Sequence, residues 1–448
     1  MDELIRDERK SLEKLNIHEL RALGKKTGVK SPASLNKSDL ISNIIEIRFG
    51  KKDIPVTETR GRPMKKVDLD HVYNMFPSFG EISNTFAAGY VDPYSYKLKK
   101  DTDKCGVVEI LNGGYGIVLT DGFVHRSSDE YIPSNFIEKY NLKDGDTITF
   151  KSKRVDKANI VASISEINGV DSSLISNRVD FKSLKPSYPK SKFDLSGESG
   201  IALISLICPI GKGSCGLIVG GQKSGKSSLL LSIAKTIKSK NSETFVSPIF
   251  VSKSVQEIEK VKLQENLASV YTLINFNCQD TIRSISLGIN RAMRHAELGK
   301  DVVILIDDIN SCYNNYVELL MKHGKDKSHA MAWMRSIFAL GGKLSNGGSL
   351  SIIGAIDDST PEGVQLKDEL NQVVNFKIVF DEKLLSLRMF PSISIGETLS
   401  NISEQLLNDK ELALSSEIRT KNLTITDPEL KIEFFKKILK AKTIDEIK

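Results

Sequence analysis

The sequence lacks paired cysteines, long apolar runs and any strong excess of charge of one sign. Its 448 residues include five scattered cysteines and no Cys-x-x-Cys pair, which argues against a zinc site or a disulfide framework. No apolar run approaches the length of a membrane helix, and the N-terminus has no apolar signal core. We therefore expect a cytoplasmic protein without a membrane partner. The net charge of +6 is mild, so a polyanionic partner has to be inferred from where the basic residues lie.

The length predicts two or three domains, because one hydrophobic core rarely serves 448 residues. Residues 1–50 carry leucine and isoleucine at helical spacing with lysine and arginine between them, which predicts a small basic helical module. A plain solubilising hairpin of helices explains this pattern as well as a binding role does. Residues 51–104 combine weak periodicity with prolines, glycines and basic clusters, which predicts a flexible basic linker or insertion.

The linker contains one short match to a DNA-binding motif. Arg60-Gly61-Arg62-Pro63 resembles an AT-hook core, whose arginines lie in a narrow minor groove. The motif has no second copy in the chain, so we favour a solvated basic linker over a weak DNA contact.

Residues 105–170 switch to period-two patterning with turn signals. The apolar segments 107–111 and 115–119 flank Asn112-Gly113-Gly114, which predicts a hairpin. Further short strands follow, so we predict a small β-barrel of the OB or cold-shock type. Such barrels bind single strands through aromatic and polar side chains, and the candidates here are Tyr115, Asp129, Tyr131, Asp156 and Lys157. Core or rim packing explains the two tyrosines equally well.

After a connector at residues 171–195, residues 196–448 alternate apolar strands with helices, which is typical of a parallel α/β domain. The segment from Gly220 to Ser227 matches G-x-x-x-x-G-K-[ST] between an apolar strand and an apolar helix. The backbone N–H groups of such a loop wrap around phosphates, and the helix N-terminus adds positive potential. We predict a nucleotide site in which Lys226 reaches the β- and γ-phosphates and the Ser227 hydroxyl contacts Mg²⁺.

A second apolar strand, residues 302–306, ends in Asp307-Asp308. Ligands bind at the carboxyl ends of the strands in such sheets, so we predict that Asp307 helps to hold Mg²⁺. A buried strand that ends in aspartate is common, but its place after a P-loop favours the metal role.

Several motifs occur in an order that one family shares. They are Gly106 to Leu111 with Gly114-Tyr115-Gly116, Asn141 to Ile148, Pro209 to Gly213, the P-loop, Asp301 to Asp307, Gly347 to Leu350, and Arg388 to Pro391. In this order the chain resembles the Rho family of transcription termination factors as far as about residue 407, with residues 51–104 as an insertion. The resemblance implies a multidomain fold: a small N-terminal helical module, an OB/cold-shock-type β-barrel and a C-terminal RecA-type α/β P-loop ATPase domain.

The resemblance also implies a homohexameric ring that loads on single-stranded RNA, translocates by hydrolysing ATP with Mg²⁺ between subunits, and displaces RNA polymerase. The nucleotide-contacting stretches of the family match Gly211, Lys212, Gly213, Ser214, Cys215, Gly216, Lys223, Ser224, Gly225, Lys226, Ser227 and Ser228. The family's RNA-binding strand pair matches Gly114, Tyr115, Gly116 and Ile117. Arg388 matches the arginine finger, which would stabilise charge on a neighbour's γ-phosphate.

Several positions depart from the family pattern. The family's water-activating glutamate is replaced by Lys253, which cannot act as a base unless its pKa is strongly lowered. Asp308 is the candidate substitute base and, with Lys226 and Arg388, completes the predicted catalytic set. The loop that grips RNA in the family reads Asp358 to Gly363 here and would bring Glu362 near an anionic strand, which is unfavourable. In the RNA site, Ile117 replaces an aromatic residue.

Two functions fit these observations. The first is an ATP-driven RNA translocase that terminates transcription, and the intact P-loop, Asp307 and Arg388 favour it. The second is an RNA- and nucleotide-binding ring that hydrolyses ATP slowly or not at all and acts as a regulator or a passive ring; Lys253 and Glu362 favour it. We favour the first function. A third reading, an unrelated ring ATPase with the same core fold, is weakened by the motifs in the barrel.

Overall fold

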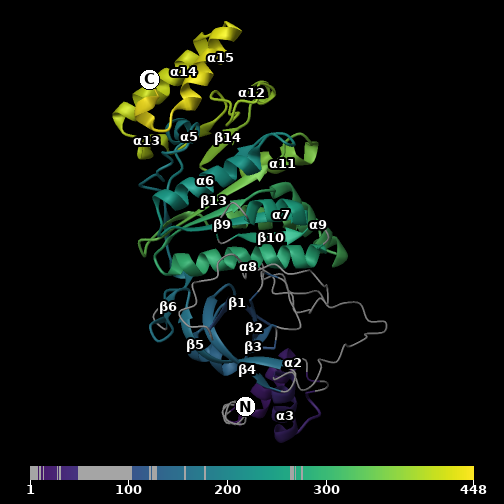
Figure 1. Ribbon diagram of the computed structural model, residues 1–448. Coiled ribbons are helices and arrows are strands. Elements are labelled where there is room, and N and C mark those ends of the chain that lie inside the picture. The colour runs from purple at the N-terminus through teal and green to yellow at the C-terminus, as the bar shows by residue number, and fades with distance from the viewer. Residues whose placement is uncertain are drawn as a thin grey trace. The chain divides into compact units, whose positions relative to one another are not determined.

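The computed structural model describes residues 9, 12–13, 15–27, 29, 32–48, 103–111, 113–120, 123, 129–155, 158–175, 178–262, 267, 269–273 and 276–447. The chain divides into two units, residues 1–178 and 179–448, coloured from purple to blue and from blue to yellow (Figure 1). The Arg60-Gly61-Arg62-Pro63 motif lies outside the described residues. Among those that are described, no helix is both long and apolar enough to cross a membrane.

The N-terminal part of unit 1 contains the helices α2 (Ile17–Lys26) and α3 (Lys37–Arg48). Asn16 begins α2 with a capping box, because its side chain accepts from the backbone N–H of Glu19 while the Glu19 carboxylate accepts from the backbone N–H of Asn16. Leu20, Leu40 and Ile44 are fully buried between the two helices. The predicted helical module is confirmed.

The rest of unit 1 is a small closed barrel. Its strands are β1 (Lys104–Ile110), β2 (Gly116–Leu119), β3 (Glu130–Ile132), β4 (Thr147–Val155), β5 (Ala158–Ile167) and β6 (Val170–Asp171). They pair in the order β3-β2-β1-β4-β5-β6, and a parallel pairing between β3 and β5 closes the sheet. The helix α4 (Ser134–Tyr140) follows β3. This arrangement confirms the predicted OB/cold-shock-type barrel and the hairpin between the first two strands.

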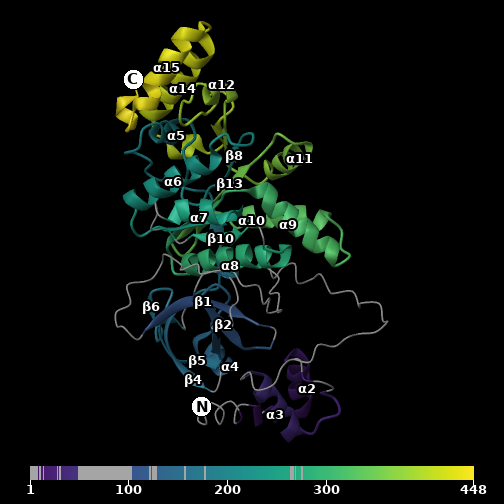
Figure 2. The same cartoon turned by 45° about the vertical axis from the view of Figure 1, so that its right-hand side comes forward.

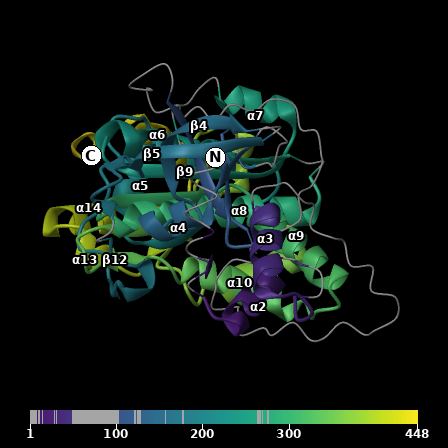
Figure 3. The same cartoon turned by 90° about the horizontal axis from the view of Figure 1, so that it is seen from below.

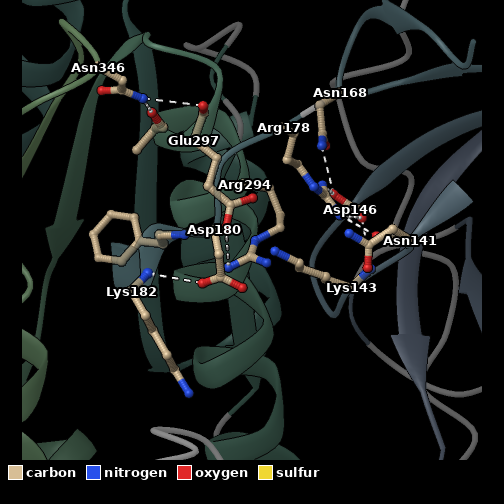
Figure 4. A network of polar contacts seen from close by, with 12 residues as sticks. Asn141, Lys143, Asp146, Asn168, Arg178, Asp180, Lys182, Arg294, Glu297 and Asn346 are labelled. Atoms are coloured by element: carbon tan, nitrogen blue, oxygen red, sulfur yellow. Dashed lines mark hydrogen bonds and ion pairs between the residues drawn. The ribbon is translucent and has the colours of Figure 1, made fainter. Parts of the chain in front are cut away.

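A buried ion pair links the end of unit 1 to the turn before β4. The Arg178 guanidinium and the Asp146 carboxylate form an ion pair, with side chains 1% and 0% exposed. A second guanidinium nitrogen donates to Asp146 Oδ2 at 2.9 Å and to the carbonyl of Asn141 at 2.6 Å. The Asn168 amide donates to Asp146 Oδ1 at 2.7 Å; Figure 4 shows these residues converging. A buried charge is tolerated only when it is paired in this way.

Unit 2 is built on one large, mostly parallel sheet. Its strands are β7 (Pro186–Ser187), β8 (Cys215–Val219), β9 (Phe245–Lys253), β10 (Val270–Leu273), β11 (Asp301–Ile306), β12 (Gly342–Leu344), β13 (Ser349–Ile356), β14 (Phe376–Val379) and β15 (Leu399–Ser400). The main path runs β10-β9-β11-β13-β8-β14-β15. The central strands β8 and β13 are buried throughout, as expected for parallel strands covered on both faces. The RecA-type α/β fold predicted for this region is confirmed.

Helices connect and cover these strands (Figure 2). They are α5 (Ile201–Ile207), α6 (Lys226–Lys240), α7 (Val255–Lys262), α8 (Cys278–Glu297), α9 (Ile309–Lys322), α10 (Ser328–Phe338), α11 (Pro361–Leu370), α12 (Glu382–Ser386), α13 (Ser403–Leu406), α14 (Asp409–Thr424) and α15 (Pro428–Lys440). The helices α9 and α10 lie side by side (Figure 3). Right-handed crossovers between neighbouring parallel strands place α6 and α7 on one face of the sheet and α8 to α11 on the other.

The last two helices belong to the core of unit 2. Ile418 of α14 and Phe435 and Ile438 of α15 are buried in the cluster that also holds α5. The Arg419 guanidinium donates to the backbone carbonyls of Ile395, Ile207 and Thr398 at 2.7–2.8 Å. These bonds tie α14 to segments that lie more than twenty residues away.

A buried histidine makes the stability of unit 2 sensitive to acid. His295 of α8 is 1% exposed and its ring stacks on Phe245 at 3.8 Å between centroids. Neither ring nitrogen has a hydrogen-bond partner among the described residues. Burial, and then the charges of Lys300 and Arg291, hold the pKa of His295 well below its ordinary value of 6.5. The folded state therefore keeps the ring neutral while the unfolded state binds a proton below about pH 6.5.

We expect this imbalance to cost about 1.4 kcal/mol of stability for each pH unit below 6.5, until the folded ring also titrates. Above pH 6.5 this loss of stability disappears, because the His295 ring is neutral in both the folded and the unfolded state. His295→Phe keeps the stack without the titration, so its midpoint of thermal unfolding should fall less between pH 6.5 and 5 than that of the unaltered chain. Equal falls in the two proteins would contradict the assignment.

Candidate nucleotide-binding site

The P-loop connects β8 to α6 in the context that the sequence predicts. Lys223 and Gly225 both have positive φ, 58° and 97°, which lets the loop curl back over the N-terminus of α6. The Lys226 ammonium donates to the carbonyls of Gly220 and Gly221, both at 2.6 Å. Burial lowers the pKa of Lys226, and nearby carboxylates, Asp357 first among them, offset part of this effect. The lysine that should hold phosphate is thus held by its own loop.

The P-loop opens on a cavity of about 520 Å³. The cavity lies where the carboxyl ends of β8, β9, β11 and β13 meet, at the point where the strand order reverses direction. Its charged lining consists of Lys223, Lys226, Lys253, Asp307, Asp308, Asp357 and Glu362. The structure therefore brings Lys223, Lys226, Ser227, Asp307 and Asp308 of the predicted site together.

An ion pair joins two residues of the cavity lining that lie at the ends of neighbouring strands. Lys253, the last residue of β9, lies with its ammonium 2.8 Å from Oδ2 of Asp307, the residue after β11. Oδ1 of Asp307 accepts from the backbone N–H of Val251 at 2.8 Å. Both carboxylate oxygens are therefore engaged, and the Asp307 side chain is only 2% exposed.

A bulge in β9 places Lys253 opposite Asp307. Between the pairs Tyr271↔Phe250 and Leu273↔Lys253, β9 advances by one residue more than β10. Ser252, at the bulge, has a left-handed backbone with φ 54° and donates its N–H to the Thr272 hydroxyl at 2.8 Å. Bulges next to functional sites re-aim a side chain. No residue pattern in the sequence predicts this bulge.

The electrostatics of the pair keep Lys253 charged. Burial lowers the pKa of Lys253, but the adjacent Asp307 carboxylate outweighs burial, so the net pKa lies above the ordinary value. Burial raises the pKa of Asp307 to about 6, although Lys253 opposes the rise. A protonated lysine cannot take a proton from water. Lys253 is therefore excluded as the general base.

Asp308 acts as the N-cap of α9. Its Oδ1 accepts from the Ser311 backbone N–H at 2.9 Å and its Oδ2 accepts from the Ser311 hydroxyl at 2.7 Å. A carboxylate at this position also complements the helix dipole. The side chain does line the cavity, so its catalytic role remains a prediction. Capping is a second, structural role of the same side chain.

The cavity also contains residues that the sequence does not predict to lie there. Asn310 holds the end of β13, because its side chain donates to the Asp357 carbonyl at 2.9 Å and accepts from the Asp357 N–H at 2.8 Å. Glu362, in the first turn of α11, lines the cavity beside the P-loop. The resemblance instead predicts that Glu362 lies in an RNA-gripping loop. The position of Asn310 three residues after Asp307 was the available signal for its proximity.

The structure does not bring Gly211 to Cys215 to the P-loop. These residues precede or begin β8, whereas the P-loop follows the other end of that strand, about 15 Å away by the rise of a strand. Gly213 instead packs against the backbone of Gly342, and Lys212 pairs with Asp301 at 2.8 Å. The stretch Gly211, Lys212, Gly213, Ser214, Cys215 and Gly216 is thus remote from the phosphates of a nucleotide bound to the same chain.

Arg388 follows α12 and is not among the residues that line the cavity. Its side chain is exposed and its backbone is left-handed, with φ 55°. Exposure suits a residue that acts on a neighbouring subunit, and this role remains a prediction.

The Mg²⁺ ligand role predicted for Asp307 does not fit this arrangement. A magnesium ion needs carboxylate or water oxygens free to complete an octahedron. Here one oxygen of Asp307 is held by a backbone N–H and the other by an ammonium. A cation at that oxygen would have to displace Lys253.

In the barrel, Tyr115 and Tyr131 lie with their ring centroids 6.3 Å apart. Tyr131 is partly exposed, whereas Tyr115 is 7% exposed and burial raises its pKa. Asp129 and Ile117 are also buried, and Ile117 pairs with Tyr131 across β2 and β3. Gly114 and Gly116 lie at the hairpin. Asp156 and Lys157 lie outside the described residues.

Family models match three parts of the chain. "Rho termination factor, N-terminal domain" matches residues 11–48, "Rho termination factor, RNA-binding domain" matches residues 104–173, and "ATP synthase alpha/beta family, nucleotide-binding domain" matches residues 200–400. The N-terminal helices and the barrel are thus similar to the two domains named for the Rho termination factor. The three matched ranges contain the helical pair, the barrel and the P-loop sheet in the order in which the structure has them.

Transcription termination factors named Rho are between a quarter and a third identical to the chain over the aligned residues. It is 29% identical to the transcription termination factor Rho of Borreliella burgdorferi over 68% of the chain and 62% of that protein. It is 26% identical to the factor of Thermotoga maritima over 90% of the chain and 86% of that protein. The chain spans about half the length of the relatives from Streptomyces lividans and Micrococcus luteus.

A solved structure shares its fold with part of the chain. An ATPase from the type III secretion system of pathogenic bacteria superposes with a TM-score of 0.51 and 17% identity, over 58% of this chain and 80% of that one. At this identity the likeness concerns the fold alone.

Proposed function

We propose that the chain is a Rho-like transcription termination factor: a ring-forming protein that binds single-stranded RNA through its barrel and uses ATP bound at the P-loop to move along RNA and release it from RNA polymerase. The observation that carries the proposal is a complete P-loop cavity in the same chain as a Rho-type RNA-binding barrel. The relatives are named for transcription termination.

A passive ring that binds RNA and ATP but hydrolyses ATP slowly is the second candidate. The Lys253–Asp307 ion pair favours it, because it removes both the expected base and the expected metal carboxylate. Hydrolysis then depends on another carboxylate of the cavity, for which Asp308, Asp357 and Glu362 are the candidates.

Steady-state ATP turnover by the purified chain, with and without a cytidine-rich RNA, separates the two functions. A motor shows turnover that rises with RNA and is lost in Lys226→Ala. Loss in Asp308→Asn as well identifies the base, and loss in Glu362→Gln instead moves that role to Glu362. No turnover, with ATP and RNA binding intact, leaves the passive ring.

Arg388 supplies a further prediction. If it reaches a neighbour's γ-phosphate, Arg388→Ala lowers kcat by about a thousandfold, the lower range for an arginine finger, with little change in ATP affinity. The exposed Lys383 of α12 provides the control, since Lys383→Ala removes a nearby charge outside the cavity. A 1:1 mixture of Lys226→Ala and Arg388→Ala chains should regain part of the turnover, because mixed rings contain sites with both groups. Failure of the mixture to exceed the sum of its parts would contradict action between subunits.

A further inference from the structure

The Asp307 carboxylate meets a backbone donor at one oxygen and an ammonium at the other. Oδ1 accepts from the Val251 N–H at 2.8 Å, and Oδ2 lies 2.8 Å from the Lys253 ammonium. The side chain is 2% exposed, so water does not compete for either oxygen. Removing one partner of a buried ion pair leaves the other charge uncompensated, which is strongly unfavourable.

Lys253 lines the same cavity as the phosphate-binding residues. The cavity that it shares with Lys226 and Ser227 is the P-loop cavity of about 520 Å³. The two ammonium groups interact electrostatically across it. Because Lys253 ends β9 after a bulge anchored on Thr272, its backbone position is fixed by the sheet. A phosphate chain on the P-loop therefore meets a second ammonium, which is paired with Asp307.

The positive charge of the Lys253 ammonium can take the place of a divalent cation. A divalent cation at a P-loop bridges the β- and γ-phosphates and neutralises their charge while a carboxylate holds it from behind. Lys253 has the same relation to Asp307: a cation in front of a buried carboxylate, facing the phosphate cavity. A second cation placed between Asp307 and the phosphates would face an ammonium at close range, which is repulsive.

We infer that this pocket binds the triphosphate of ATP without a protein-bound divalent cation, and that the Lys253 ammonium occupies the place of the metal beside Asp307. The inference rests on the proposed ATP binding at the P-loop. It concerns binding only and assigns Lys253 a positioning role toward phosphate.

The test is ATP affinity of the full chain in EDTA and in Mg²⁺, measured by calorimetric titration. The unaltered chain is expected to bind with affinities within about threefold of each other in the two buffers. Lys253→Ala removes the resident cation, so its affinity in EDTA should fall by at least about tenfold and recover in Mg²⁺. Lys253→Arg keeps the charge and should retain binding in EDTA.

Thermal unfolding with Mg²⁺ alone gives a second readout that needs no nucleotide. Mg²⁺ should raise the unfolding midpoint of Lys253→Ala, in which Asp307 lacks a cation, and leave that of the unaltered chain unchanged. This measurement also shows whether Lys253→Ala is folded. If Lys253→Ala does not fold, the inference is decided by the ATP affinities of Lys253→Arg and the unaltered chain, both measured in EDTA.

The outcomes are distinguishable. Binding of ATP by the unaltered chain only in Mg²⁺, or a rise in its unfolding midpoint with Mg²⁺ alone, overturns the inference while the proposed function stands. No binding of ATP in either buffer overturns the proposed function itself.

Discussion

Lys226→Ala is expected to weaken ATP binding by about a hundredfold. Its ammonium, on the first residue of α6, is placed to donate charged hydrogen bonds to the β- and γ-phosphates. A hundredfold loss corresponds to about 2.7 kcal/mol, the upper range for hydrogen bonds to a charged group. The structure adds that Lys226 already donates to Gly220 and Gly221, so ATP has to replace these two bonds.

Lys235→Ala is the matched control for that experiment. Lys235 is an exposed lysine of the same helix and lies outside the cavity. Both variants are titrated with a fluorescent ATP analogue, and their thermal unfolding is compared with that of the unaltered chain. Equal affinities of the two variants for the ATP analogue would show that the P-loop is not the ATP site.

Arg178→Ala is expected to destabilise unit 1 by about 3–5 kcal/mol. The substitution leaves the Asp146 carboxylate buried and without its cation. Such an uncompensated buried charge strongly destabilises the folded state. The loss also removes the bond to the Asn141 carbonyl (Figure 4). Hydrogen exchange of the full chain should show faster exchange in β4 and β5, since the turn before β4 is held by Asp146.

A surface ion pair of the same barrel provides the comparison. Lys151 lies 3.9 Å from Asp103 and is 55% exposed, so Lys151→Ala is expected to cost less than about 1 kcal/mol. Replacing both buried partners, Arg178→Met with Asp146→Leu, should recover much of the loss, because no lone charge remains. Protection in Arg178→Ala as high as in Lys151→Ala would contradict the assignment.

The sequence predicted the elements of the fold because each has a local signature. The period-two segments around Asn112-Gly113-Gly114 and the apolar runs before Gly220 and Asp307 identify a barrel and a parallel sheet without any knowledge of contacts. The motif from Gly220 to Ser227 likewise carries its own chemistry. These predictions needed only neighbours along the chain.

The geometry of the site could not be predicted in the same way. Lys253 and Asp307 meet because β9 and β11 are neighbours and because an extra residue at Ser252 re-aims the end of β9. A bulge of this kind has no composition signal when its residue is serine. The resemblance shows that Lys253 replaces the family's glutamate, but it does not predict the ion pair between Lys253 and Asp307. The matched motif from Gly211 to Cys215 likewise did not reveal that it lies at the other end of β8 from the P-loop.

Release of nascent RNA from a purified, stalled RNA polymerase complex tests the central claim most directly. The account predicts release that requires ATP, increases with a cytidine-rich transcript and disappears with Lys226→Ala but not with Lys235→Ala. No release, from a preparation that binds both ATP and RNA, would contradict the account and leave a passive ring.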